Sequence, residues 1–404
     1  METLQPKLRF PEFKGNWNKF QIKDIGNIIT GNTPPTANNN FYNGNYLFVS
    51  PFDINTGRWV KNTKTTLTKE GFEKGRKIRK GSTMFVCIGS TIGKIAQNNI
   101  DCITNQQINS VVPIDNDDNF VYSLLEYHSP KIRLLAAEQA VPLINKTTFS
   151  EYELLMPSLE EQTKIANFLS SVDEKLNLLK EKKTLLEDYK KGIMQKIFNQ
   201  EIRFKDDNGN DFEDWKTSIL SDVVNLFHGF QFRTSDFTSK GIAVIKISNV
   251  IGNNLDLNNL TFIKKERFED FKSFEIKNDD ILMSLTGNIG RIIEVKDKPF
   301  TILQNYRVGK FIPLDENVIN KPFLKYLLAS DLVFGRFSQL ANQSAQANFG
   351  KQDMDKINIS YPPIAEQTKI ANFLSAIDEK IELVSNQIQD TQEYKRGLLQ
   401  QMFV

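Results

Sequence analysis

Two long stretches of the chain carry apolar residues at the spacing of an α-helix. Both begin with ten identical residues, EQTKIANFLS, at 161–170 and again at 366–375. The apolar positions that follow are separated mostly by three or four residues, as in a coiled-coil seam. The expected seam consists of Leu169, Val172, Leu176, Leu179, Leu186, Ile193 and Ile197 in the first stretch and Leu374, Ile377, Ile381, Val384, Ile388, Leu398 and Met402 in the second. Ten identities at one offset indicate a tandem duplication.

The starts of the two helices differ in their capping residues. Ser158 and Glu161 have the spacing of a capping box, whereas Pro363 replaces the serine in the second copy. Each helix is expected to run for about 40 residues, which corresponds to roughly 60 Å. Each contains a single glycine, Gly192 or Gly397. Because glycine costs about 1 kcal/mol relative to alanine inside a helix, its placement suggests a close helix contact, with a simple bend as the alternative.

The segments outside the helices are rich in short strand-like runs that Gly, Asn and Pro interrupt. We expect strands at Tyr46–Val49, Thr83–Ile88, Asn109–Ile114, Ile242–Ile247 and Ile281–Leu285, and a helix over 119–137. The two segments correspond weakly, pairing Trp17 with Trp215, Gly31 with Gly229, Gly93 with Gly290 and Gln106 with Gln304. The predicted fold class is α+β, with two similar mixed α/β domains separated by two long helices. The domains are 1–155, 156–200, 201–360 and 361–404.

The order globule, helix, globule, helix favours one pairing of the helices. The first helix delivers the chain to the second globule, so the second helix must run back, and the pair is antiparallel. Parallel pairing would need a long return connection, and chain connections tend to be short. The prediction is an antiparallel coiled coil with approximate twofold symmetry between the globules.

Composition narrows the class of protein without naming a partner. Hydrophobic residues make up 40% and charged residues 25%, as in soluble globular proteins. A net charge of +2 excludes neither nucleic acid nor protein as a partner. The first residues lack the apolar core of a signal peptide, and no apolar run reaches about 18 residues, so we expect a cytoplasmic protein.

Few residues are suited to metal binding or nucleophilic catalysis. Cys87 and Cys102 lack CxxC spacing, and His128 and His228 are the only histidines. These four residues do not form a four-ligand zinc pattern, and reduced structural thiols are the favoured interpretation. His228 is interpreted as structural. No P-loop, GxSxG, HExxH or GxGxxG motif occurs. We therefore expect no catalytic residue and no metal site.

The predicted geometry suits duplex DNA. Paired DNA readers are placed one helical turn, about 34 to 36 Å, or a multiple of it apart. Two similar globules at the ends of a rod could each enter a major groove. Because they differ in sequence, their half-sites would differ, which predicts a split, asymmetric target with an unread spacer.

Polar loop residues are the candidates for reading bases, because Arg pairs with guanine and Asn or Gln with adenine. In the first globule they are Thr33, Ser90, Thr91, Lys94, Gln106, Gln107, Asn109 and Lys146. In the second they are Gln231, Arg233, Asn288, Arg291, Gln304, Asn305, Arg307, Gln346 and Asn348. Ordinary turn chemistry is the alternative for any single residue. The basic run at 74–80 could hold phosphates or be a solvated surface.

The repeated motifs resemble those of the specificity subunit of type I restriction-modification systems. The pattern [LI]xEQxxIxxxL occurs at 159–169 and 364–374, and the helix ends YKKGIMQKIF and YKRGLLQQMF match each other. The resemblance implies two target-recognition domains and no catalysis by this chain. It also implies docking of two methyltransferase subunits that carry S-adenosylmethionine, and of two restriction/translocase subunits that use ATP and Mg²⁺.

Two other classes of protein remain open at this point. One is a coiled-coil adaptor that joins protein-binding domains without DNA. The other is an enzyme such as a nuclease acting alone. The paired carboxylates of this chain at 117–118 and 279–280 are, however, interpreted as turn residues. DNA binding by the purified complex would exclude the adaptor, and cleavage or methylation by the isolated chain would support the enzyme.

Overall fold

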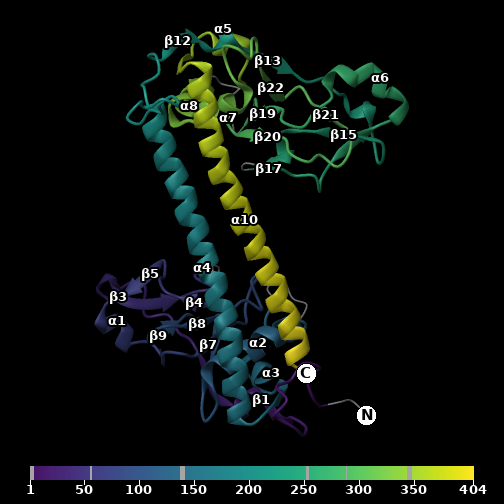
Figure 1. Ribbon diagram of the computed structural model, residues 1–404. Coiled ribbons are helices and arrows are strands. Elements are labelled where there is room, and N and C mark those ends of the chain that lie inside the picture. Colours follow the sequence, from purple (N-terminus) through teal and green to yellow (C-terminus); the bar gives the residue numbers. More distant parts are fainter. Residues whose placement is uncertain (1–3, 55–56, 137–141, 252–253, 288, 344–347) are drawn as a thin grey trace. The chain divides into compact units, whose positions relative to one another are not determined.

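The chain folds into two compact units, and each contains part of both long helices. The computed structural model describes residues 4–54, 57–136, 142–251, 254–287, 289–343 and 348–404. Unit 1 comprises Met1–Lys182 and Val384–Val404, and unit 2 comprises Lys183–Leu383. The long helices are α4, Leu159–Phe198, and α10, Ile364–Met402 (Figure 1). The boundary between the units therefore crosses both helical regions.

Unit 1 contains two main sheets and a short strand pair. The first sheet has the order β2 (Gly26–Thr30), β10 (Ile108–Pro113), β7 (Thr83–Val86), β8 (Ile95–Asn98) and β4 (Trp59–Val60). The second has the order β5 (Thr65–Leu67), β3 (Tyr42–Val49), β9 (Cys102–Thr104) and β6 (Lys77–Ile78). Strands β1 (Asn18–Gln21) and β11 (Glu153–Met156) pair separately. The shorter helices are α1 (Lys69–Glu73), α2 (Asp118–Arg133) and α3 (Lys146–Ser150), with 3₁₀ turns at Ile22–Asp24 and Asn39–Phe41.

Unit 2 repeats this plan. Its first sheet has the order β13 (Val224–His228), β22 (Val308–Pro313), β19 (Ile281–Ser284) and β20 (Ile292–Glu294). Its second has the order β14 (Phe237–Thr238), β18 (Thr261–Ile263), β15 (Ile242–Ile245) and β21 (Ile302–Gln304). The short pairs are β12 (Lys216–Ile219) with β23 (Asn358–Tyr361), and β16 (Val250–Ile251) with β17 (Asn254–Leu255). The helices are α5 (Leu220–Val223), α6 (Phe268–Phe271), α7 (Lys321–Ala329), α8 (Asp331–Gln343) and α9 (Lys351–Met354), with 3₁₀ turns at Thr234–Asp236, Ile247–Asn249, Lys265–Arg267 and Lys272–Phe274.

The pairing of strands confirms that the two globules are similar. In both, four strands of the first sheet pair antiparallel in the same order, β2-β10-β7-β8 and β13-β22-β19-β20. In both, the second sheet contains one parallel pair, β3 with β9 and β15 with β21. Each run expected as a strand contains one, although the run over 242–247 ends as a strand at Ile245. The helix expected over 119–137 is α2, which ends at Arg133, and residue 137 lies outside the described residues. Mixed α/β globules and two long helices are therefore confirmed.

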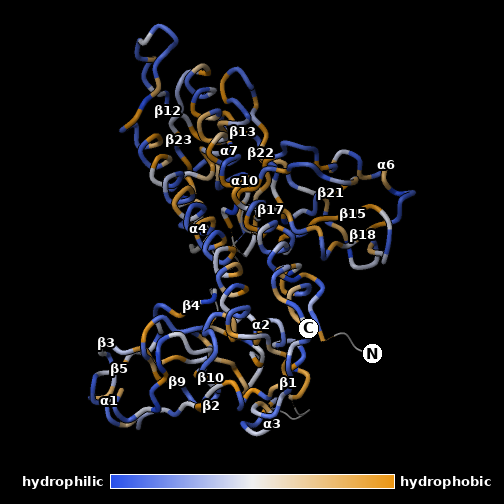
Figure 2. The backbone as a smooth tube through the Cα atoms, turned by 60° about the horizontal axis from the view of Figure 1, so that its bottom comes forward, coloured by the Kyte–Doolittle hydropathy of each residue, from blue (hydrophilic) through white to orange (hydrophobic). Residues whose placement is uncertain are grey.

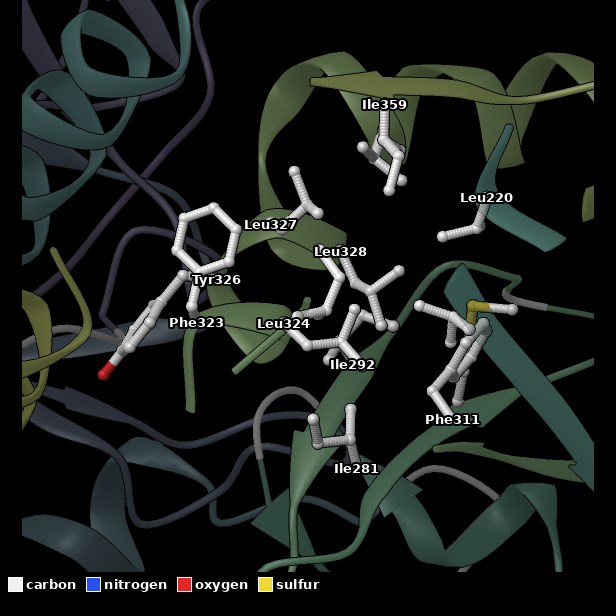
Figure 3. Packing of buried hydrophobic residues seen from close by; sticks show 14 of the residues in the cluster. Leu220, Ile281, Ile292, Phe311, Phe323, Leu324, Tyr326, Leu327, Leu328 and Ile359 are labelled. Carbon is white, nitrogen blue, oxygen red and sulfur yellow. The ribbon is translucent and has the colours of Figure 1, made fainter. Parts of the chain in front are cut away.

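Both long helices contribute to the core of each unit. In unit 1, Leu169 and Val172 of α4 and Leu398 and Met402 of α10 belong to one buried cluster with residues of the globule. In unit 2, the cluster that contains Phe323 and its neighbours on α7 also includes residues of both long helices. Figure 3 shows how the side chains of α7 meet those of β19, β20 and β22 in this cluster. Burial of apolar surface thus fixes each globule to both helices.

Within each unit the two helices run in opposite directions. In unit 1, the ion pair between Asp173 and Lys395 lies beside an apolar cluster that holds the start of α4 and the end of α10. In unit 2, Lys190 pairs with Asp378, and the cluster holds the end of α4 and the start of α10. Along both helices, hydrophilic and hydrophobic residues alternate (Figure 2). The antiparallel arrangement is therefore confirmed.

The predicted seam positions fall into two burial groups. The residues that are buried are Leu169, Val172, Ile197, Leu374, Ile377, Val384, Leu398 and Met402. Those that are half-buried are Leu176, Leu179, Leu186, Ile193, Ile381 and Ile388. All of the buried members except Val384 belong to the apolar cluster of a globule, and two half-buried members, Ile193 and Ile381, pack against the cluster of unit 2.

The glycines inside the helices make no close contact. No atom outside the local helix backbone lies within 4 Å of the position that a Cβ would occupy at Gly192 or Gly397. The expected close helix contact is therefore wrong. Gly31 and Gly229 differ, because a Cβ there would lie 2.2 Å and 2.3 Å from backbone oxygens of Thr104 and Gln304.

Replacing the helical glycines should stabilise the protein. Gly192→Ala and Gly397→Ala are each expected to raise the free energy of unfolding by about 0.5–1 kcal/mol, because alanine loses less backbone entropy on folding. Urea denaturation followed by circular dichroism measures the change in midpoint. Gly31→Ala is the matched control and should lower the midpoint, since its Cβ would overlap backbone. A lower midpoint for both helical variants would show that these glycines make a contact after all.

Candidate nucleic-acid interface

Four loops of unit 1 meet at one edge of its sheets. They follow β2, follow β7, connect β9 to β10, and precede α3. The backbone hydrogen bonds between them are Gly31 N to Ile108 O (3.1 Å), Cys87 N to Gln107 O (2.8 Å), Gly89 N to Pro142 O (3.0 Å) and Ile144 N to Cys87 O (2.9 Å). The loops that were predicted to contact DNA are therefore brought together, although they are far apart in the sequence.

Unit 2 joins the equivalent loops, and the two backbone hydrogen bonds of its Leu285 match those of Cys87 in unit 1. The backbone hydrogen bonds are Phe230 N to Gln304 O (3.0 Å), Tyr306 N to Phe230 O (3.0 Å), Leu285 N to Arg307 O (2.9 Å) and Phe349 N to Leu285 O (2.8 Å). Because these bonds involve the main chain, they hold the loops whatever side chains the loops carry. The two units share one scaffold with different side chains on it.

In unit 1, four of the predicted residues are exposed on these loops. They are Thr33, Ser90, Gln106 and Lys146. The Thr33 hydroxyl donates a hydrogen bond of 2.8 Å to the Gln106 side-chain oxygen, which joins the loop after β2 to the loop before β10. This bond orients the Gln106 amide, and a glutamine whose amide is oriented is suited to reading an adenine edge.

The other predicted residues of unit 1 serve the fold. Asn109 is buried, and its amide accepts a hydrogen bond from the Thr30 hydroxyl and donates one to the Cys87 sulfur. Gln107 is half-buried and accepts from the Asn105 amide at 2.9 Å. Thr91 is half-buried, and its carbonyl accepts from the Lys94 backbone N–H. These side chains shape the loops from within.

Lys94 faces a different part of unit 1. It is half-buried and lines a cavity of about 390 Å³ together with Asp173 and Leu176 of α4. The structure therefore associates Lys94 with the long helix, while its neighbour Ser90 is exposed on the loop.

In unit 2, the exposed predicted residues are Gln231, Arg233, Arg307 and Asn348. The Arg307 guanidinium lies 5.2 Å from the centre of the Tyr306 ring, a cation–π arrangement that limits its freedom. Arg291 is half-buried, and its guanidinium lies at the 3.5 Å limit of a hydrogen bond to the Val250 carbonyl.

Two predicted residues of unit 2 are buried, and two lie outside the described residues. The Gln304 amide donates to the carbonyls of Phe227 and Val308, at 3.0 Å and 2.7 Å. Asn305 is buried, and its side-chain oxygen accepts from the Arg307 backbone N–H. Asn288 and Gln346 are the two that lie outside the described part of the chain.

The correspondence of Gln106 with Gln304 is wrong. Asn105 and Asn305 are equivalent, because each donates its backbone N–H to a strand of the second sheet and accepts from the N–H three residues on. Gly93 and Gly290 remain equivalent, with the same positive φ of 91° and 92°. The intervening segment is therefore three residues longer in unit 2. The shift makes Arg307 the counterpart of Gln107.

The basic run at 74–80 is partly neutralised. Lys77 pairs with Glu73 at 2.6 Å, and Arg79 makes a bidentate pair with Asp118 at 2.7 Å. The hydrogen bonds that Arg79 donates to the Asp118 carboxylate raise the pKa of Arg79. Arg76 donates to the Thr30 carbonyl at 2.9 Å. These contacts hold the segment to its own globule.

The repeated Glu-Gln pair joins each globule to its long helix. Glu161 is 2% exposed and accepts two hydrogen bonds from Arg9, at 2.7 Å and 2.8 Å. Glu366 is 0% exposed and accepts from Arg203, at 3.2 Å and 2.7 Å. The hydrogen bonds that each arginine donates to its glutamate raise the pKa of the arginine. The predicted capping box is only half formed, because Ser158 accepts from the Glu161 N–H at 3.5 Å while the Glu161 carboxylate turns to Arg9.

The glutamines that follow hold the start of a second helix in each unit. The Gln162 side chain accepts from the Asp117 N–H at 3.2 Å, just before α2. The Gln367 side chain accepts from the Asn320 N–H at 2.8 Å, just before α7. Each also donates to the proline carbonyl at its own helix start, at 3.1 Å and 2.8 Å. The motif therefore sets the position of α2 or α7 against the long helix.

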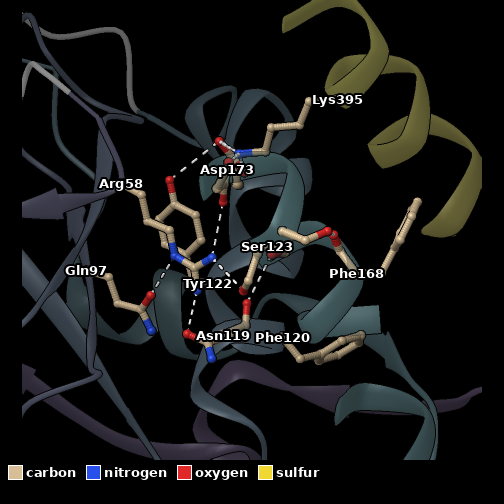
Figure 4. A network of polar contacts seen from close by, with 12 residues as sticks. Arg58, Gln97, Asn119, Phe120, Tyr122, Ser123, Phe168, Asp173 and Lys395 are labelled. Atoms are coloured by element: carbon tan, nitrogen blue, oxygen red, sulfur yellow. Dashed lines mark hydrogen bonds and ion pairs between the residues drawn. The ribbon is translucent and has the colours of Figure 1, made fainter. Parts of the chain in front are cut away.

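A buried polar network in unit 1 was missed by the sequence analysis (Figure 4). Arg58 donates to Gln97 at 2.8 Å, to Asn119 at 2.5 Å and to Asp173 at 3.1 Å, and Lys395 pairs with Asp173 at 2.8 Å. Periodicity could not indicate Arg58, which lies 115 residues from Asp173. The signal that was available is the repeated lysine within the two helix ends, YKK and YKR.

The titratable groups of unit 1 that resemble catalytic residues are unsuited to reaction. Cys87 and Cys102 are buried free thiols, and burial raises the pKa of each to about 12. Burial lowers the pKa of His128 to about 4, and its Nδ1 contacts the Tyr152 hydroxyl at 3.1 Å. In unit 2, burial likewise lowers the pKa of His228. Reduced structural thiols are thereby confirmed for the two cysteines.

The described residues contain neither a metal-binding cluster nor a membrane-spanning helix. No group of three or more His, Cys, Asp or Glu side chains there is arranged to hold a metal ion. Among the helices in the described ranges, none is long and apolar enough to cross a membrane.

The sequence has relatives among known specificity subunits. The type I restriction enzyme MjaVIII specificity subunit of Methanocaldococcus jannaschii is 26% identical over 408 aligned positions, which cover 97% of this chain and 92% of that subunit. The HindI specificity subunit of Haemophilus influenzae is 31% identical over 150 positions, covering 36% of this chain and 32% of that subunit.

The fold is also shared with a solved structure. The S subunit of a type I restriction-modification system from M. genitalium superposes with a TM-score of 0.62 at 17% identity, covering 99% of both chains. The model of the type I restriction modification DNA specificity domain matches this chain twice, over residues 14–188 and 212–392. These matches span most of the sequence, and the chain therefore belongs to the family of type I restriction-modification specificity subunits.

Proposed function

We propose that this specificity subunit recognises a bipartite, asymmetric site in double-stranded DNA, with one half read by each unit. The observation that carries the proposal is the loop surface, which both units build around two equivalent backbone hydrogen bonds, those of Cys87 and of Leu285, and which bears different exposed side chains. One scaffold with two sets of side chains suits two different half-sites.

The exposed residues have the chemistry of base and phosphate contacts. Arg307, positioned by Tyr306, is suited to the paired acceptors of guanine, and Gln106, positioned by Thr33, to adenine. Lys146 is exposed at the start of α3 and is suited to a phosphate. Gln231 and Arg233 extend the same surface in unit 2.

The partners follow from the family. We propose that α4 and α10 dock two methyltransferase subunits, and that two restriction/translocase subunits join through them in the cytoplasm. S-adenosylmethionine, ATP and Mg²⁺ would bind in those partners, which carry out the catalysis. A solved relative with a TM-score of 0.53 and 15% identity is described in terms of complex assembly and conformational transition of the type I R-M system.

Arg307 provides the sharpest test of DNA reading. Arg307→Ala should weaken binding of the methyltransferase complex to its own site by about 1–3 kcal/mol, roughly 5- to 150-fold, because one bidentate base contact is lost. Fluorescence anisotropy with a labelled duplex measures the affinity, and the association constant should fall steeply with salt.

The control variant is Lys216→Ala, which removes an exposed cation on β12 outside the loops. Its affinity should match that of the unaltered complex. Equal affinity of Arg307→Ala and Lys216→Ala would exclude Arg307 from the interface. A complex with no salt-dependent DNA binding would favour the adaptor function instead.

Exchange of one globule tests the modular part of the proposal. Replacing residues 201–360 with the corresponding domain of another specificity subunit should change only one half of the methylated site. Sequencing of methylated adenines in host DNA, with and without the exchange, reports both halves. A change in both halves would contradict reading by separate units.

A further inference from the structure

Asp173 lies at the centre of a buried ionic group in unit 1. Its carboxylate pairs with Lys395 of α10 at 2.8 Å and with Arg58 of the globule at 3.1 Å. The three side chains are 9%, 11% and 4% exposed. Figure 4 shows Arg58 and Lys395 converging on Asp173 from different parts of the unit.

Asp378 occupies the equivalent place in unit 2. Its carboxylate pairs with Lys190 of α4 at 2.5 Å and with Lys325 of α7 at 3.4 Å, and accepts a hydrogen bond from the Tyr326 hydroxyl at 2.8 Å. Burial alone would raise the pKa of Asp378, but Lys190 and Lys325 hold it below its ordinary value.

The two groups share one plan. Each takes a carboxylate from one long helix, a lysine from the other long helix and a cation from the globule. Asp173 and Asp378 are the same position of the duplicated sequence, and so are Lys190 and Lys395. The spacing from Asp173 to Lys190 equals that from Asp378 to Lys395, so one antiparallel register satisfies both groups.

Stability alone does not explain these charges. A buried ion pair contributes little net stability, because desolvation offsets the attraction. An apolar seam with the usual heptad spacing, in contrast, tolerates a slip of one helix along the other, and a single polar position in such a seam is known to specify register. Here a slip of α10 along α4 by one heptad would separate Lys395 from Asp173 and Lys190 from Asp378, which breaks the ion pair between the two helices in each group.

We infer that Asp173 and Asp378 are the positioning residues that fix the register in which α4 and α10 pair. Each also seats its globule on the paired helices, through Arg58 in unit 1 and Lys325 in unit 2. This role does not depend on what the loops bind, so its test is independent of any test of DNA recognition.

Cysteine cross-linking of the full-length chain tests the register in unit 1. Asn177 and Gln392 are exposed and line one cavity, so the pair Asn177→Cys with Gln392→Cys reports the native register. The pair Asn177→Cys with Ser385→Cys lies one heptad away on α10 and reports a slipped register. The natural cysteines are buried and should not react.

Neutral replacement of the ionic group should change which pair cross-links. In Asp173→Asn and in Lys395→Met, the yield of the 177–392 product should fall by about threefold or more relative to the 177–385 product. Lys395→Arg keeps the charge and should retain the native pattern. A purely structural role would lower the thermal midpoint and leave the cross-linked pair unchanged.

A second variant keeps the test decisive if the single replacements do not fold. Arg58→Leu, Asp173→Leu and Lys395→Leu together remove all three buried charges, which buried ionic groups commonly tolerate, and Glu126, the second partner of Lys395, is 26% exposed and stays hydrated. This triple variant should fold and still lose the preference for the 177–392 product. Continued dominance of that product in the folded variants would overturn the inference.

Discussion

The buried glutamates at the start of the two long helices are the constraint on which the reading surfaces depend. A carboxylate that is almost fully withdrawn from water requires a cationic partner, and Glu161 and Glu366 find theirs in Arg9 and Arg203. Both arginines precede their globule in the sequence, so each pair fixes where the chain enters. The neighbouring glutamines then fix α2 and α7 against the long helices. The position of each globule on its helices follows from this small set of contacts.

The scaffold of the loops explains how two units can share a fold and differ in the side chains that they expose. The bonds that join the loops run between main-chain groups, so they survive replacement of the side chains. Gly31 and Gly229 are the exceptions, because carbonyl oxygens lie where a Cβ would be. Exposed positions such as Gln106 and Arg307 are free of that restriction. Variation can therefore concentrate on the surface that faces a ligand.

The sequence was sufficient to predict the elements but not the partners of their side chains. Periodicity located both long helices and the main strands, because burial of one face imposes a regular spacing. The choice of polar loop residues placed Asn109 among the candidate DNA contacts, although this side chain is buried between Thr30 and Cys87. The nearly constant offset between the two globules also paired Gln106 with Gln304. The alternation of apolar and polar residues does not reveal that one segment is three residues longer in unit 2.

The predicted loops did prove to be neighbours within each unit, which is the part of the site that the duplication could indicate. Features common to both copies, such as the loops and the Glu-Gln pair, stood out without a structure. Contacts that the two copies form with different residues could not be recognised from the sequence. Arg58 contributes to the group around Asp173 from a loop before β4, whereas Lys325 contributes to the group around Asp378 from α7. Because Arg58 and Lys325 are not at equivalent positions of the two copies, comparison of the copies does not reveal their shared role.

The duplicated halves are not independent folding units, because unit 1 is completed by the end of the chain. Phe403 packs against Trp17, Phe120 and Tyr127, with ring centres 6.2 Å, 5.6 Å and 5.6 Å apart. Leu398 and Met402 enter the same cluster. The core of the first globule therefore forms fully only when residues 398–403 are present. This dependence limits which domain exchanges are tolerated, since an incoming first globule must present an apolar surface that fits the end of α10.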